Sequence, residues 1–198
     1  MAQPAGRFET IDIFNLEYVS DPQISPDGSK VIYVRNFKDI MTDKSYSNMW
    51  IVNPDGTENR PLTTGNQSDS YPRWSNDGTR VAYKSNREGS LQLYLRWIGS
   101  GAETKLTNLQ QSPGSLSWSP DDQYLAFDMF VPKKSPAAIP MPAAPAGAKW
   151  NDTPVYIEDL RYRADGRGYL KEGSRQLFVL STEGGTPHQV SSGEKDFG

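Results

Sequence analysis

Cysteine is absent from the 198-residue chain, and histidine occurs once, at His188. Disulfide bonds, thiol catalysis, thiolate metal sites and sites with several histidine ligands are therefore excluded within this chain. No stretch approaches the roughly 18 consecutive apolar residues of a membrane-spanning helix, and residues 1–6 carry no apolar signal core. The sequence predicts no metal site, no cofactor and no membrane span.

A strong excess of one charge is also missing, because 21 basic and 24 acidic residues give a net charge of −3. Proteins that bind the phosphates of nucleic acids usually carry a basic excess, so we expect no nucleic-acid partner. The composition, with 35% hydrophobic residues, is that of an ordinary soluble chain. The composition does not decide between two locations: the cytoplasm, or the periplasm or medium after removal of a signal peptide.

The chain does contain a segment repeated three times, at residues 21–33, 71–83 and 115–127. Each copy has a short apolar run ending in Ile or Trp, a turn of the Ser-Pro-Asp-Gly type and an alternating apolar run. Proline presets φ, aspartate accepts local backbone hydrogen bonds and glycine permits positive φ, so such a turn joins two antiparallel strands tightly. Each copy therefore predicts a β-hairpin.

A second pair of apolar runs, separated by turn residues, follows each copy and predicts a second hairpin, which gives four strands per repeat. Ile24 and Trp74 are 50 residues apart, and Trp74 and Trp118 are 44 residues apart. Four short strands in about 40 to 50 residues are typical of β-propeller blades, so we predict an all-β chain of about three four-stranded blades. Propellers close with roughly four to eight blades, so we expect a fragment of a longer protein.

The repeats divide the chain into an N-terminal segment and three blades. For residues 1–20 we favour a short helix, although the alternation of Ile11 and Ile13 also fits a strand. The expected blades are blade one at residues 21–64, blade two at residues 65–110, and blade three at residues 111–198 with an insertion at about 131–174.

The insertion of blade three has two contrasting halves. Residues 132–148 are rich in proline and alanine, which is typical of an extended excursion. Residues 150–173 are dense in aromatic and charged side chains. Long loops in compact domains are often binding elements, so we expect this second half to carry function.

The run from Leu160 to Tyr169 reads Leu-Arg-Tyr-Arg-Ala-Asp-Gly-Arg-Gly-Tyr. Together with the Ser-Pro-Asp-Gly turn and the Trp74 and Trp118 copies, it resembles the N-terminal propeller of prolyl oligopeptidase family serine peptidases. The most similar subgroup is that of acylaminoacyl peptidases and bacterial dipeptidyl peptidases. The turns alone also occur in the propeller protein of the Tol-Pal system, so the insertion is the more specific part of the resemblance.

The resemblance implies a seven- or eight-bladed propeller that caps a C-terminal α/β-hydrolase domain with a Ser-Asp-His triad. The chain contains no Gly-x-Ser-x-Gly nucleophile elbow, so we assign it no catalytic residue and expect the hydrolase domain and the remaining blades beyond Gly198. His188 matches no catalytic position of the family and receives no role. The propeller would gate access for short peptides and help to bind them.

The resemblance also implies that blade insertions hold the N-terminal end of a peptide substrate. A carboxylate can pair with a free α-ammonium group, which makes Glu158 and Asp159 candidates for that contact. An aromatic wall can take an apolar side chain of the peptide, which makes Trp150 and Tyr156 candidates for that surface.

Arg161 and Arg163 complete the candidate substrate site. Both arginines could instead have a purely structural role in the insertion. Surface ion pairs between these arginines and the two preceding acidic residues could simply fix the insertion. Tyr162 and Tyr169 could then pack it against the blade. A second function class stays open as well, that of a non-enzymatic, Tol-Pal-like propeller that binds proteins.

Overall fold

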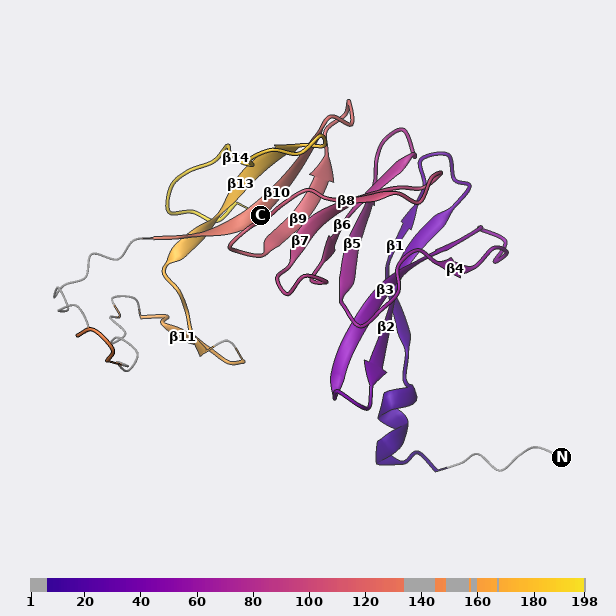
Figure 1. Cartoon of the computed structure of the whole chain (residues 1–198), viewed down its shortest axis with the longest axis horizontal. Coiled ribbons are helices and arrows are strands. Elements are labelled where there is room, and N and C mark those ends of the chain that lie inside the picture. The colour runs from indigo at the N-terminus through magenta and orange to yellow at the C-terminus, as the bar shows by residue number, and fades with distance from the viewer. Residues whose placement is uncertain (1–6, 134–144, 149–156, 158–159, 167, 198) are drawn as a thin grey trace.

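The computed structural model describes residues 7–133, 145–148, 157, 160–166 and 168–197. Figure 1 shows three sheets that follow one another along the chain, from indigo at the N-terminal end to yellow at the C-terminal end. A 3-10 helix, η1 (Thr10–Asn15), precedes the first sheet. The predicted all-β fold with about three four-stranded blades is confirmed.

Each blade is an antiparallel sheet whose strands pair in their order along the chain, and in the third sheet an insertion separates the neighbours β10 and β13. The first sheet consists of β1 (Tyr18–Ile24), β2 (Val31–Asp39), β3 (Lys44–Val52) and β4 (Arg60–Pro61). The second consists of β5 (Asp69–Trp74), β6 (Arg80–Ser85), β7 (Gln92–Trp97) and β8 (Glu103–Lys105). The third consists of β9 (Pro113–Trp118), β10 (Tyr124–Pro132), β13 (Gly173–Ser181) and β14 (His188–Gln189).

The repeated turns close in the way that their residues predict. Ser25 N–H donates to the carbonyl of Lys30 at 2.8 Å, and the Ser25 hydroxyl donates to the Asp27 carboxylate at 2.6 Å. Hydrogen bonds from the side chain of Ser25 and the backbone of Ser29 lower the pKa of Asp27 to about 2. Gly28 follows at a φ of 73°, in the left-handed region that glycine adopts without strain.

Two apolar cores lie between the three sheets. The core between the first and second sheets contains the buried Ile32, Met49 and Tyr83, and the core between the second and third contains Leu93 and Phe127. Both cores contain residues from facing sheets, which is the face-to-face packing of propeller blades. The aligned hydrophobic positions of the repeats therefore serve contacts between blades.

The tryptophans that end the first strand of blades two and three connect each blade to the one before it. Trp74 Nε1 donates to the carbonyl of Gln23 at 3.1 Å, and Trp118 Nε1 donates to the carbonyl of Arg73 at 2.9 Å. Both indoles are partly buried, so a polar partner for the ring nitrogen is needed. The repeat thus encodes a hydrogen bond between blades as well as a core.

The connections between the second and third strands all lie at one end of the sheets, because each blade is an antiparallel meander. They are the β2–β3 hairpin tip, the β6–β7 turn, and the insertion between β10 and β13, which contains the short strands β11 (Arg163–Ala164) and β12 (Gly168–Tyr169). In Figure 1 η1 lies below the first sheet, and the insertion, labelled at β11, lies below the third. This end therefore carries η1, the tip of the β2–β3 hairpin and the insertion.

Candidate functional site

The described half of the insertion forms a small hairpin with exposed aromatic side chains. Its strands β11 and β12 contain two residues each and flank a turn at Gly166, whose φ is 71°. The Leu170 amide closes the hairpin on the carbonyl of Tyr162 at 2.8 Å. The rings of Tyr162 and Tyr169 stack with centroids 6.2 Å apart, yet 45% and 58% of these residues' surfaces stay exposed.

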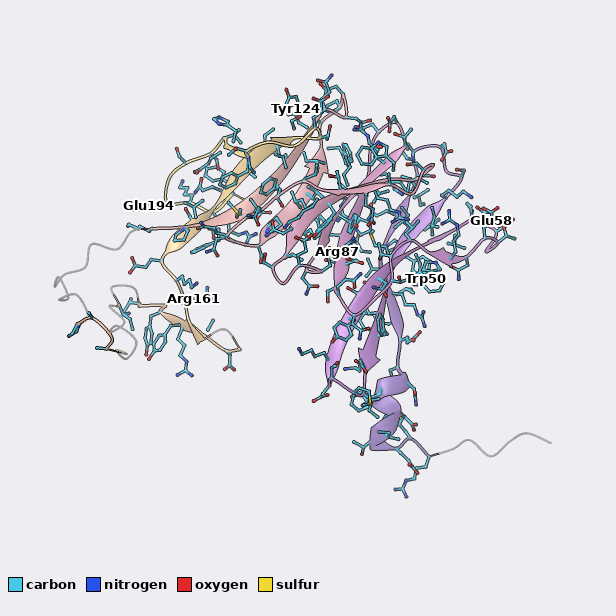
Figure 2. The ribbon with its side chains drawn as sticks, viewed as in Figure 1. Trp50, Glu58, Arg87, Tyr124, Arg161 and Glu194 are labelled. Atoms are coloured by element: carbon cyan, nitrogen blue, oxygen red, sulfur yellow. The ribbon has the colours of Figure 1, made fainter. Side chains whose placement is uncertain are left out.

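The structure describes two of the six residues predicted for substrate binding. Arg161 and Arg163 both lie on the hairpin and are exposed, and Figure 2 shows Arg161 away from the three sheets. The other four predicted residues lie outside the described part of the chain, namely Trp150, Tyr156, Glu158 and Asp159. Tyr162 and Tyr169 stack on each other, and the adjacent Leu160 is fully exposed.

A second apolar surface lies at the same end of the sheets, where η1 meets the tip of the β2–β3 hairpin. Ile11 on η1 and Ile40 and Met41 at the tip are 51%, 54% and 88% exposed. A shallow cavity of about 430 Å³ lies between the two elements and is lined by Ile11, Phe14 and Ile40 among others. A 3-10 helix with no buried residue has little intrinsic stability, so this surface is suited to contact with another protein segment.

A charged network occupies the β6–β7 connection between these two surfaces. Arg87 donates to Glu103 at 2.9 Å and to the hydroxyl of Tyr83, and its guanidinium lies 4.5 Å from the ring centroid of Tyr94. Burial raises the pKa of Tyr94 to about 12, and burial likewise raises the pKa of Tyr83. The fully buried Asp69 lies 3.8 Å from Arg87.

Sequence reasoning did not identify this network. The available signal is that Tyr83 and Tyr94 stand at the repeat positions that Phe127 and Phe178 occupy in the third sheet, with both pairs of rings stacked at 5.7 Å. A buried tyrosine needs a partner for its hydroxyl, and a phenylalanine does not. The substitution of two tyrosines therefore indicates nearby polar side chains in blade two.

The described side chains at this end of the chain are aromatic, aliphatic and charged. The single histidine, His188, is exposed on β14, which belongs to the third sheet and not to this surface. Among the described residues, no group of three or more His, Cys, Asp or Glu residues could hold a metal ion. Within the same residues, no helix is long and apolar enough to cross a bilayer.

The chain is similar to several proteins that are named as peptidases. It is 29% identical over 188 residues to the uncharacterized peptidase YuxL of Bacillus subtilis, which covers 94% of this chain and 28% of that protein. It is 31% identical over 123 residues to dipeptidyl-peptidase 5 of Porphyromonas gingivalis, which covers 62% of this chain and 18% of the relative. The chain thus spans less than a third of the curated relatives' length.

Solved structures show the same fold. The acylaminoacyl peptidase of Pyrococcus horikoshii superposes with a TM-score of 0.67 at 19% identity, over 89% of this chain and 25% of that chain. The matching relatives and structures confirm the resemblance to peptidase propellers that the repeats and the insertion indicate.

One family model covers most of the chain. The description of that family is the TolB beta propeller domain, and the match runs over residues 5–139. Within this stretch lie the first two sheets and the β9–β10 hairpin of the third. The chain therefore belongs to the TolB β-propeller family.

Proposed function

We propose that this chain is the non-catalytic propeller part of a serine peptidase that hydrolyses short peptides, and that its insertion helps to bind the substrate. The reaction class is that of dipeptidyl or acylaminoacyl peptidases, in which a hydrolase domain elsewhere in the protein supplies the catalytic serine. The propeller limits entry to short or flexible peptides.

The observation that carries the proposal is the exposed Tyr/Arg hairpin on the β10–β13 insertion. Tyr162, Tyr169, Arg161 and Arg163 combine aromatic surface with positive charge, and these residue types dominate binding hot spots. Two-residue strands cannot hold such a hairpin by themselves, so a bound partner would supply part of its stability. The relatives named as peptidases support the proposal that this partner is a peptide.

Within this proposal, Glu158 or Asp159 receives the α-ammonium of the peptide, while Trp150 and Tyr156 contact an apolar side chain near it. An ammonium–carboxylate contact in a partly desolvated site is a charge-assisted hydrogen bond. Its loss should therefore weaken binding of peptides with a free amino group and leave peptides with a blocked amino group unaffected.

The test is steady-state hydrolysis of paired chromogenic peptides, free and N-acetylated, by the protein at its natural length. We expect Glu158→Ala or Asp159→Ala to raise KM for the free-amine peptide by about tenfold, which corresponds to roughly 1.4 kcal/mol. Glu183→Ala, which changes an exposed acid in the β13–β14 turn at the opposite end of the sheets, serves as the matched control. Equal effects on both peptides would contradict the ammonium contact.

The alternative function is a protein-binding propeller without enzymatic activity. One observation favours it, a 39% identity over 56 residues to the Tol-Pal system protein TolB of Francisella tularensis, which covers 28% of this chain and 13% of that protein. Absence of any peptide hydrolysis by the natural-length protein, together with capture of a defined protein partner, would support this alternative.

A further inference from the structure

The first strands of the three blades lie next to one another. Strand β5 contacts both β1 and β9, and Figure 1 shows it between them. The tryptophan indoles that join the blades donate to carbonyls on these same strands, those of Gln23 on β1 and Arg73 on β5. The blades of a propeller surround a central channel and are closest together at the centre of the ring. The first strands are therefore the ones nearest to that channel.

The start of β5 lies at the same end of the sheets as the insertion. Ser70 pairs with Lys84, which is one residue before the end of β6 and its connection to β7. A register shift follows between Ser70 and Arg73, and within it Tyr71 has a φ of 59°. Tyrosine seldom adopts this left-handed conformation, and bulges of this kind redirect a side chain.

Two cations converge on the ring of Tyr71. The guanidinium carbon of Arg73 lies 3.6 Å from the ring centroid, and the Nζ atom of Lys84 lies 4.2 Å from it. All three side chains belong to residues that are partly buried. A hydrogen bond with Ser115 and the charges of Arg73 and Lys84 lower the pKa of Tyr71. We call Tyr71, Arg73 and Lys84 the inner site.

The two acidic residues near the inner site are already paired. Both carboxylate oxygens of Asp21 lie 3.0 Å from Nη1 of Arg73. Asp128, which is 3% exposed, forms an ion pair with Arg175 and accepts a hydrogen bond from the Ser115 amide. Neither carboxylate is therefore free to neutralise a further cation.

Lys84 has a positive charge and no acidic partner. Its ammonium donates to the carbonyl of Gly114 at 3.0 Å, and it forms no ion pair with any residue that the structure describes. Burial lowers the pKa of Lys84, because a partly desolvated ammonium loses the stabilisation that water gives it. An anion beside Lys84 would restore that stabilisation, and the two remaining ammonium hydrogens could donate to it.

We propose that the inner site binds the C-terminal carboxylate of a short peptide, with Lys84 as its ion-pair partner. This inference rests on the proposed peptidase function and deepens it. A carboxylate has one negative charge, which matches the one unpaired ammonium of the inner site. The cations would repel the α-ammonium group at the other end of the peptide.

The position of the inner site adds a length requirement for the substrate. The insertion, which we propose to hold the α-ammonium, lies at the same end of the sheets. A peptide bound at both of its ends must match the distance between the two sites. The inner site would thus select peptides by their length as well as by their free carboxyl group.

Lys84 also joins blade two to blade three through its hydrogen bond to Gly114, so its removal can affect stability. The tests therefore compare a peptide that has a free carboxyl group with the same peptide as its C-terminal amide. A purely structural role of Lys84 would affect both peptides equally, whereas an ion pair with the carboxylate affects only the first.

The first test needs no enzymatic activity. The natural-length protein is treated with a short pulse of acetic anhydride, and acetylation of Lys84 is measured by mass spectrometry. We expect saturating tetraalanine to slow this acetylation at least about threefold and tetraalanine amide to leave it unchanged, because a bound carboxylate raises the pKa of the amine and shields it. Lys105, which pairs with Glu88 at 2.6 Å on the outer strand β8, is the internal control.

Three results of this labelling would overturn the inference. They are no protection of Lys84 by tetraalanine, equal protection by tetraalanine and its amide, and protection by inorganic phosphate alone. The last result would make the inner site a site for an inorganic anion and not for a peptide.

The second test measures hydrolysis of the same two peptides. We expect Lys84→Met to raise KM for tetraalanine about tenfold and to leave KM for the amide and both kcat values within about twofold. Lys84→Arg, which keeps the charge, should retain the preference for the free acid, and Lys105→Met is the matched control. An unchanged ratio of the two KM values in Lys84→Met would overturn the inference. Hydrolysis of neither peptide by the wild type would contradict the proposed function, and the labelling test would still decide whether the inner site binds a carboxylate.

Discussion

At Asp122, hydrogen bonds to the preceding blade compensate for a backbone conformation that favours glycine. Its φ of 58° is in the left-handed region, where glycine stands in the two earlier turns. The residue is 8% exposed, and its carboxylate accepts three hydrogen bonds from Asn76 and Asp77. These bonds outweigh a conformational cost of about 1 kcal/mol.

Removal of the Asp122 carboxylate should destabilise the packing of blade three on blade two. We predict that Asp122→Ala lowers the free energy of unfolding by about 1–3 kcal/mol, because the backbone amides of Asn76 and Asp77 lose a charged acceptor while the left-handed φ remains. Asp122→Gly should cost less, because glycine removes the conformational strain. Urea denaturation measures both, and an alanine variant as stable as the wild type would contradict this role.

Glu103 is the residue through which the blade-two network should respond to pH. Burial alone would raise the pKa of Glu103, but hydrogen bonds from Arg87, Tyr83 and Arg96 outweigh it, so the pKa lies below the ordinary 4.5. A carboxyl group with a lowered folded-state pKa stabilises the fold above its unfolded pKa, and this contribution is lost as the pH falls through the folded value.

The substitution Glu103→Gln should therefore destabilise the protein at neutral pH, by about 1–2 kcal/mol for charged hydrogen bonds that are partly exposed. The difference from the wild type should shrink as the pH falls below about 4.5. Thermal unfolding at a series of pH values checks this, and Glu194→Gln, in an exposed pair with Lys133, is the control. A difference that does not change with pH would contradict the assignment.

The elements of this chain could be predicted to different extents. Turn residues and alternating apolar runs lie within about a dozen residues of one another, so the sheets of all three blades were predictable from the repeats. The contacts of Asp122 with Asn76 and of Arg87 with Tyr83 could not be predicted from such local patterns. The first joins residues 46 positions apart across an interface, and the second depends on which face of β6 is buried.

The sequence named six candidate residues in the insertion, and the structure describes two of them. Composition indicated the second half of the insertion, and Arg161 and Arg163 do lie on an exposed hairpin there. The sequence could not show that Tyr162 and Tyr169 stack on each other, because that contact depends on where the turn at Gly166 places β12. Nor could it indicate the apolar surface that η1 forms with the β2–β3 hairpin.

The hairpin of the insertion should matter for binding and not for stability. Its strands contact each other and contribute no residue to either apolar core, so Tyr169→Ala should change the free energy of unfolding by less than about 0.5 kcal/mol. The same variant should raise KM for short peptides by about fivefold through the loss of roughly 1 kcal/mol of aromatic contact. An unchanged KM with lowered stability would make the hairpin a structural element.

At the scale of the whole molecule, features for two different kinds of contact lie in different places. The sheet faces carry the positions for contacts between blades. The end where the second and third strands of each blade are connected carries the exposed hairpin and the η1 surface. In the proposed peptidase, the blades would pack in a ring through the sheet faces, and the end with the hairpin would meet the substrate and the hydrolase domain.

The most direct test of the account is to label the protein at its natural length with a fluorophosphonate probe and to map the modified residue by mass spectrometry. A peptidase of the proposed class should carry one labelled serine, in a Gly-x-Ser-x-Gly sequence outside these 198 residues. A natural-length protein that takes up no label and hydrolyses no peptide would contradict the peptidase assignment and favour the protein-binding propeller.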